Sequence, residues 1–126
     1  MGIEIIEVNH VNVTVPGALE TAAKHFYGDL LGLKQIEKPE GPRKHIGAWY
    51  ELGPTQLHLS IEDDANNHES DRHVCYLVGD LGDAAATFRN AGIEIISDER
   101  PMSGISRFFV RDPGGNLLEI TERTIR

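Results

Sequence analysis

The chain has 126 residues, 40% of them hydrophobic and 25% charged, which is typical of one globular domain. Twenty acidic residues against twelve Lys and Arg give a formal net charge of −8, and no basic block could follow a phosphate backbone, so no nucleic-acid partner is expected. No apolar run approaches the roughly 18 residues that cross a bilayer, and no basic secretory segment opens the chain. We therefore expect a cytoplasmic protein without a membrane partner. Cys75 is the single cysteine, which excludes an intrachain disulfide.

The first half of the chain has the pattern of one strand, one helix and three further strands. Val11, Val13 and Val15 alternate with polar residues, which predicts a strand that ends at residues 16–17. Apolar residues at helical spacing predict a helix over residues 18–31, with Gly32 at its C-terminal end. Turn residues then separate three strand-like segments, at residues 33–38, 45–52 and 55–61.

The second half repeats this order of elements. Residues 62–71 are polar and without hydrophobic period, so they are interpreted as a linker. After them the pattern predicts a strand, a helix that ends before Gly92, and three strands, at residues 73–78, 81–91, 93–97, 105–111 and 116–121. The sequence therefore predicts an internal duplication of class α+β within a single domain spanning residues 1–126. Module one covers about residues 3–61 and module two about residues 72–122.

Four polar residues fall on strand faces that the helices would not cover. Residues two apart on a strand share a face, so the apolar residues of each strand face a helix and their neighbours face away. Aligning the two modules matches His10 with His73 and His58 with Glu119. These four side chains are predicted to project from the same uncovered faces.

Three imidazoles and a carboxylate form a ligand set suited to a divalent ion such as Zn²⁺, Ni²⁺, Mn²⁺ or Fe²⁺. The alternative is a solvated polar face, which needs no ion. The matched positions of His10, His58, His73 and Glu119 in the two modules favour the metal site. Cys75 shares the parity of His73, but a lone thiol in a strand is more often a small buried hydrophobe.

Other side chains are candidates to line a substrate site around the ligands. Asn12, Arg107 and Phe109 are also expected on the strand faces that the helices do not cover. Arg107 could pair with a substrate carboxylate or phosphate, the alternative being a surface arginine. Of the neighbours Trp49 and Tyr50, one should face the site and the other the core. Aligning the two hairpins favours Tyr50 for the site, and a shift of one residue would reverse this assignment.

Three features together resemble the vicinal oxygen chelate superfamily. They are the duplicated βαβββ order with a histidine opening each module, the helical FYGDLLGL at residues 26–33, and DPGGNLLE at residues 112–119. That group includes glyoxalase I, fosfomycin-resistance transferases, extradiol dioxygenases, methylmalonyl-CoA epimerase and bleomycin-resistance proteins. The resemblance implies a curved eight-stranded cup, with His10, His73 and Glu119 holding a metal that keeps two positions open for vicinal oxygens of a substrate. His58 stands where glyoxalase I has a glutamate and the epimerase a glutamine.

The resemblance implies a divalent-metal-dependent lyase, isomerase or dioxygenase that acts on a small-molecule substrate. The metal would polarise a carbonyl, and Glu119 or His58 would serve as the catalytic base. One alternative is a non-catalytic protein that binds a drug or metabolite, of the bleomycin-resistance type, and another is a structural dimer with a vestigial site. Small members of the family commonly form homodimers, so the site could be built within one chain or across two.

Overall fold

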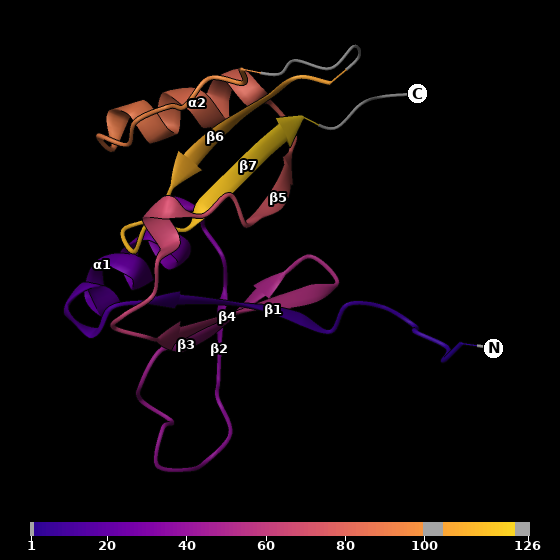
Figure 1. Ribbon diagram of the computed structural model, residues 1–126, viewed down its shortest axis with the longest axis vertical. Helices are drawn as coiled ribbons and strands as arrows, with labels where there is room; N and C mark the ends of the chain where they lie inside the picture. Colours follow the sequence, from indigo (N-terminus) through magenta and orange to yellow (C-terminus); the bar gives the residue numbers. More distant parts are fainter. Residues whose placement is uncertain (1, 100–104, 123–126) are drawn as a thin grey trace. The chain divides into compact units, whose positions relative to one another are not determined.

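The computed structural model describes residues 2–99 and 105–122. The chain divides into two compact units, Met1–Asp63 and Asp64–Arg126. Each unit has its own sheet, four-stranded in the first and three-stranded in the second, and each sheet has its own helical segment (Figure 1). Within the described residues no helix is both long enough and apolar enough to cross a membrane.

The first unit follows the predicted order of elements. Its sheet has the order β1-β4-β3-β2, with β1 parallel to β4 and the other pairs antiparallel. Two strands match the prediction closely, whereas β2 and β3 are shorter, and β3 begins only after Gly47, whose φ of 72° is outside the strand region. The elements are β1 (His10–Val15), η1 (Gly17–Leu19), α1 (Glu20–Lys24), η2 (His25–Leu30), β2 (Gln35–Ile36), β3 (Ala48–Leu52) and β4 (Thr55–Ile61).

The predicted helix of the first unit is continuous but changes geometry along its length. A 3₁₀ turn, η1, leads into α1, and the last turn, η2, is a π-helix in which Leu31 N–H donates to the carbonyl of Phe26. Phe26 and its neighbour Tyr27 are both buried. Gly32, with φ of 70°, ends the segment as the sequence predicts.

The core of the first unit lies between this helical segment and one face of the sheet. Val15, Ala23 and Leu59 form a buried cluster, and Leu57 on β4 faces the same side. The alternation of β1 and β4 is therefore as predicted. It leaves the side chains of His10 and His58 on the opposite face of the sheet.

The second unit contains a sheet of order β5-β7-β6, with β5 parallel to β7 and β6 antiparallel to it. Phe108, Val110, Leu118 and Ile120 are buried on one face, and Phe88 of α2 packs on Phe108. The elements are η3 (Asn67–Glu69), β5 (His73–Val78), α2 (Leu81–Asn90), β6 (Arg107–Arg111) and β7 (Leu117–Glu122).

The α+β duplication predicted from the sequence is confirmed, since in both units the first strand pairs in parallel with the last. Two details differ. The strand expected at residues 93–97 is reduced, within the described residues, to an isolated bridge between Ile96 and Phe109. The expected linker also contains packed structure, because Asn67 is buried and donates its amide to the carbonyl of Gly114.

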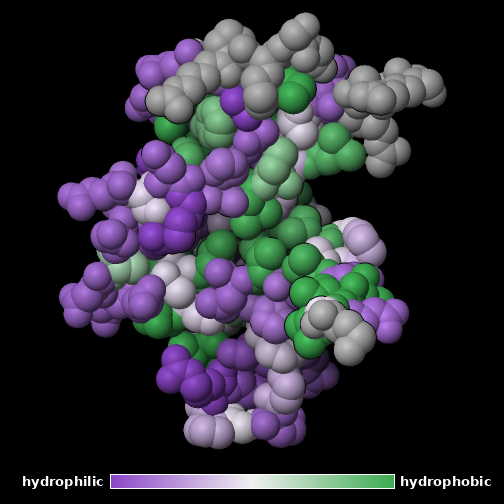
Figure 2. Space-filling model, turned by 45° about the vertical axis from the view of Figure 1, so that its right-hand side comes forward, coloured by the Kyte–Doolittle hydropathy of each residue, from purple (hydrophilic) through white to green (hydrophobic). Residues whose placement is uncertain are grey.

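Several large apolar side chains stay exposed. Leu77 on β5 and a group near the N-terminus have more than half of their surface open to solvent, the latter being Ile3, Ile5, Ile6 and Val8. Figure 2 shows hydrophobic residues among the hydrophilic ones on the face that it draws. Such side chains are common on protein surfaces.

Candidate functional site

The first pair of candidate ligands lies on neighbouring parallel strands of the first unit. His10 on β1 is paired with Gln56 of β4, so its ring lies beside that of His58, two residues further along β4. The two rings are stacked with centroids 4.0 Å apart and planes 16° apart. Nδ1 of His10 is 2.9 Å from the side-chain oxygen of Asn9, and Nε2 of His58 is 2.9 Å from that of Gln56.

Trp49 covers the other face of the His58 ring. The ring centroids are 3.9 Å apart and the planes are within 1° of parallel. The register explains this contact, since Leu52 pairs with Thr55 across a two-residue turn and thereby sets Trp49 opposite His58 and Tyr50 opposite Leu57.

The prediction that Tyr50 faces the site is therefore wrong. Tyr50 is 1% exposed and lies on the core side, where its ring contacts Tyr27. Burial raises the pKa of its hydroxyl. Trp49, which the sequence pattern places in the core, is the residue that faces His58.

His58 is more buried than a residue on an uncovered face would be. Its side chain lies between the rings of His10 and Trp49, which leaves it 8% exposed. Loss of hydration lowers the pKa of His58, and the nearby charges of His10 and Lys38 lower it further. The imidazole is therefore held in its neutral form, the form that can bind a metal ion.

The second pair of candidate ligands lies on neighbouring parallel strands of the second unit. Nε2 of His73 on β5 is 3.1 Å from Oε1 of Glu119 on β7. Nδ1 of His73 is 2.8 Å from the backbone carbonyl of Asp71. Because a carbonyl only accepts hydrogen bonds, Nδ1 must carry a proton, and Nε2 is the nitrogen directed at Glu119.

Glu119 has two further partners. Nη1 of Arg107 donates to its Oε1 at 3.4 Å, and the thiol of Cys75 donates to its Oε2 at 3.4 Å. Cys75 is an exposed residue, contrary to expectation, although its thiol contact with Glu119 is partly buried. Loss of hydration, followed by the hydrogen bond and charge of Glu119, raises the pKa of the Cys75 thiol to about 11. The thiol is therefore protonated at neutral pH.

Arg107 is engaged by a second carboxylate. Its Nε lies 2.9 Å from Oδ2 of Asp98 and its Nη2 lies 3.3 Å from Oδ1, a two-pronged contact in which both side chains are largely buried. Asp98 raises the pKa of Arg107. Arg107, a candidate to bind a substrate anion, therefore already contacts the carboxylates of Asp98 and Glu119.

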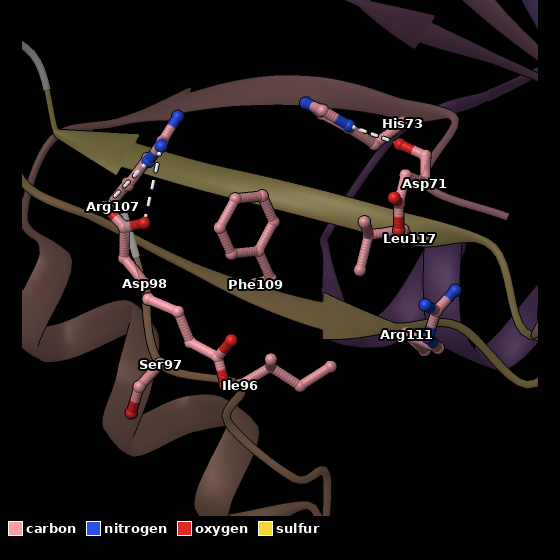
Figure 3. A pocket seen from close by; sticks show the side chains of 10 residues that line it. Asp71, His73, Ile96, Ser97, Asp98, Arg107, Phe109, Arg111 and Leu117 are labelled. Atoms are coloured by element: carbon pink, nitrogen blue, oxygen red, sulfur yellow. Dashed lines mark hydrogen bonds and ion pairs between the residues drawn. The ribbon is translucent and has the colours of Figure 1, made fainter. Parts of the chain in front are cut away.

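A cavity of about 340 Å³ opens beside this second pair. Phe109, Ile96 and Leu117 give it apolar walls, and His73 and Arg107 lie at its edge. Figure 3 shows the Phe109 ring between the Arg107–Asp98 pair and the His73–Asp71 pair. The ring meets His73 edge-on at 5.8 Å, and the Arg107 guanidinium lies 5.4 Å from its centre. This volume is within the range of small-molecule sites.

Some site residues carry a sequence signal and others do not. Asn12 lies on the His10 face as predicted, where its side-chain oxygen accepts from Ser60 at 2.7 Å. Trp49 could have been found from the two-residue turn after β3. Asp98 and Asp71 contact Arg107 and His73 from segments without regular secondary structure. Side-chain direction has no period in such segments, so the sequence pattern does not predict these contacts.

The structure thus brings the four predicted ligands into two pairs, one in each unit. Within residues 2–99 and 105–122, no three or more His, Cys, Asp or Glu form a group with metal-binding geometry. The second pair fits a shared ion, since metal bonds of about 2.0–2.2 Å place two adjacent ligand atoms roughly 2.9–3.4 Å apart, and His73 and Glu119 lie 3.1 Å apart. Nδ1 of His10 and of His73 both face oxygen atoms, which leaves Nε2 for an ion.

The comparisons with known families and with solved structures agree on one family. The family model described as Glyoxalase/Bleomycin resistance protein/Dioxygenase superfamily matches residues 7–120. No curated protein matches the sequence. Among solved structures, a glyoxalase family protein from Bacillus anthracis is 31% identical with a TM-score of 0.85, and the match covers 98% of this chain and 100% of that one.

More distant structures share the fold. The fosfomycin resistance protein FosX from Listeria monocytogenes is 14% identical, with a TM-score of 0.77 and coverage of 97% of this chain and 94% of that one. Lactoylglutathione lyase from Agrobacterium tumefaciens is 21% identical, with a TM-score of 0.70 and coverage of 94% and 95%.

Proposed function

The chain belongs to the Glyoxalase/Bleomycin resistance protein/Dioxygenase superfamily, and from this premise we propose that it is a divalent-metal-dependent enzyme, a lyase, isomerase or dioxygenase. Its substrate would be a small molecule that binds the ion through two neighbouring oxygens. The observation that carries the proposal is the approach of His73 Nε2 to Glu119 Oε1, with Nδ1 of His73 fixed on a backbone carbonyl. This arrangement orients an imidazole nitrogen and a carboxylate oxygen toward one point.

Both pairs of ligands would bind one ion. His10 and His58 would supply two imidazoles from the first unit, and His73 and Glu119 would supply the other imidazole and the carboxylate. The ion would be Zn²⁺, Ni²⁺, Mn²⁺ or Fe²⁺, all of which accept nitrogen and oxygen ligands. When bound, it would supply Lewis-acid chemistry to a substrate oxygen.

The residues around the ion would transfer the proton in the reaction. His58 is a candidate base because its imidazole is neutral, and its lowered pKa favours release of the proton again after transfer. Glu119 is the other candidate base, and Nη1 of Arg107 lies 3.4 Å from its Oε1. Phe109 would contact an apolar part of the substrate in the cavity, which Arg107 also lines. Asn12, on the His10 face of β1, would contact a polar group of the substrate.

The metal content of the purified protein tests this proposal. Protein prepared without chelator should contain about one ion per intact site, and the His10→Ala, Glu119→Ala double variant should contain none. His25→Ala is the matched control, because His25 is an exposed histidine on η2, ion-paired with Asp29, outside the proposed site. Wild-type protein that is folded and binds no added Zn²⁺, Ni²⁺, Mn²⁺ or Fe²⁺ would contradict the proposal.

A second measurement tests the mode of substrate binding. Acetohydroxamic acid presents two neighbouring oxygens and serves as a probe of the open positions. Its addition to the Co²⁺-loaded protein should change the visible spectrum of the cobalt with a saturating concentration dependence. An unchanged spectrum would contradict binding through vicinal oxygens.

We further propose that the protein is a cytoplasmic homodimer. Mixing two variants decides whether each site is shared. His10→Ala,His58→Ala chains and His73→Ala,Glu119→Ala chains each lack one pair of ligands. If sites are shared between chains, a mixed dimer regains one complete site and binds one ion. If each site lies within one chain, the mixture binds none.

A non-catalytic binding protein is the alternative that one observation favours. Glu119 is satisfied by protein donors alone, since it accepts hydrogen bonds from His73, Arg107 and Cys75. A cavity with apolar walls lies beside it and could hold a small molecule without chemistry. Under this alternative, the His10→Ala, Glu119→Ala variant would retain ligand affinity.

A further inference from the structure

We infer that Trp49 is the positioning residue for His58, so that its indole fixes the plane of the imidazole and prepares it to bind the metal ion. The inference rests on the proposed function, because it assigns a residue to support one of the proposed ligands. It gives a role to a side chain that the sequence pattern places in the core.

The first argument is the geometry of the contact. The indole lies parallel to the imidazole at 3.9 Å, and the His10 ring lies on the opposite face at 4.0 Å. An imidazole between two parallel rings cannot tilt without losing contact on one side. Its rotation is therefore confined to its own plane.

The second argument is that stacking uses the ring faces and not the ring nitrogens. Nε2 of His58 faces the side-chain oxygen of Gln56 at 2.9 Å, a single contact that an ion would replace. The indole contact remains when this exchange occurs. Trp49 can thus hold the ring in the same orientation before and after metal binding.

The third argument comes from comparing the three histidines. Nδ1 of His73 is fixed by the carbonyl of Asp71, and Nδ1 of His10 faces the side chain of Asn9. Within the described part of the chain, Nδ1 of His58 has no such oxygen partner. A ligand histidine needs a partner that sets its orientation, and the partners of His58 are rings.

Trp49 is the single tryptophan of the chain, so its fluorescence reports directly on this contact. Ni²⁺ is paramagnetic and quenches an indole close to it. Titration with Ni²⁺ should quench the emission of the wild-type protein and of the control His25→Ala in a saturable way, and excess Zn²⁺ should reverse the quenching. The same titration of His58→Ala, which removes one of four ligands, should need a higher Ni²⁺ concentration for half-saturation, and quenching with the wild-type concentration dependence would overturn the inference.

Substitution of Trp49 tests the positioning role by metal affinity. Trp49→Phe keeps an aromatic face and should bind Zn²⁺ within a few-fold of wild type, whereas Trp49→Leu and Trp49→Met should lose about 10–100-fold, as measured by competition with a chromophoric chelator. Thermal unfolding shows which variants are folded. Two non-aromatic variants are used so that the test remains possible if one of them does not fold. Zn²⁺ affinity equal to wild type in a folded non-aromatic variant overturns this inference alone. Absence of metal binding by the wild type overturns the proposed function as well.

Discussion

Nε2 of His73 lies 3.1 Å from Oε1 of Glu119, across the parallel pair of β5 and β7. The register that pairs Cys75 with Glu119 places His73 one diagonal step away on the same face. Backbone pairing therefore sets this contact, and the ligand pair forms with the sheet. Any change at either side chain tests the site without altering the strands that carry it.

Glu119→Gln should abolish stoichiometric metal binding while leaving the fold intact. The amide oxygen can still accept from His73 and Arg107, but the charge that attracts a cation is lost. We expect Zn²⁺ affinity to fall by more than the roughly 10–100-fold typical of a supporting residue, as measured by isothermal titration calorimetry. Glu94→Gln is the charge-matched control, since Glu94 is exposed. Equal affinities in the two variants would show that Glu119 is not a ligand.

The faces of the strands could be predicted from the sequence because they follow a period of two, and buried valines and leucines mark the core side. Leu57 and Leu59 on β4 are buried as predicted, which puts His58 on the other face. The register between strands depends on turn geometry, which hydrophobic alternation does not reveal. The assignments of Trp49 and Tyr50 were reversed for this reason.

Gly47→Ala should destabilise the first unit strongly. Gly47 has φ of 72°, and a Cβ there would lie 2.0 Å from the carbonyl oxygen of Leu59, so the backbone must move. We expect a loss of about 3 kcal/mol or more in the free energy of unfolding, measured in urea. Gly53→Ala is the matched control, with φ of 54° and open space around it, and it should cost only about 1 kcal/mol. Similar losses in both variants would contradict a steric cause at Gly47.

Glu20 should make the first unit sensitive to acid. The Gly47 N–H donates to its carboxylate at 2.9 Å, and this hydrogen bond, followed by that of Lys24, lowers the pKa of Glu20 below 4.5. A carboxyl whose pKa is lower in the folded state stabilises the fold above its unfolded pKa and loses that contribution as pH falls through the folded pKa. Wild type should therefore be more stable than Glu20→Gln at pH 7, with the difference shrinking below about pH 4.5. A difference independent of pH would contradict this origin.

Tyr76→Phe should stabilise the second unit. Within the described residues, the buried hydroxyl of Tyr76 has no hydrogen-bond partner, and burial together with the Asp112 carboxylate raises its pKa, so it stays protonated. Removing an unpaired buried hydroxyl should add about 1 kcal/mol to the free energy of unfolding and raise Tm by roughly 2–5 °C. A lower Tm in differential scanning calorimetry would show that the hydroxyl contributes a favourable contact.

The position of Glu119 also depends on the turn that precedes β7. Asp112 is 4% exposed, and its carboxylate accepts hydrogen bonds from the backbone N–H of Gly114 and of Asn116 at 2.9 Å each and from the Asn116 amide at 2.8 Å. The DPGGN segment was recognisable in the sequence because these turn residues each have a local role. The effect of this turn on the position of Glu119 could not be recognised in the sequence, because the turn acts through the start of β7.

Asp112→Ala should therefore reduce both stability and metal binding. Loss of three hydrogen bonds to a buried carboxylate should cost about 2–4 kcal/mol in urea unfolding. Asp112→Asn keeps one acceptor oxygen and should cost less. Because Glu119 lies only two residues into β7, which begins at Leu117, a loosened turn should also weaken Zn²⁺ binding in the folded Asp112→Ala protein. Unchanged Zn²⁺ affinity with reduced stability would mean that pairing with β5 and β6 alone is sufficient to hold the carboxylate in place.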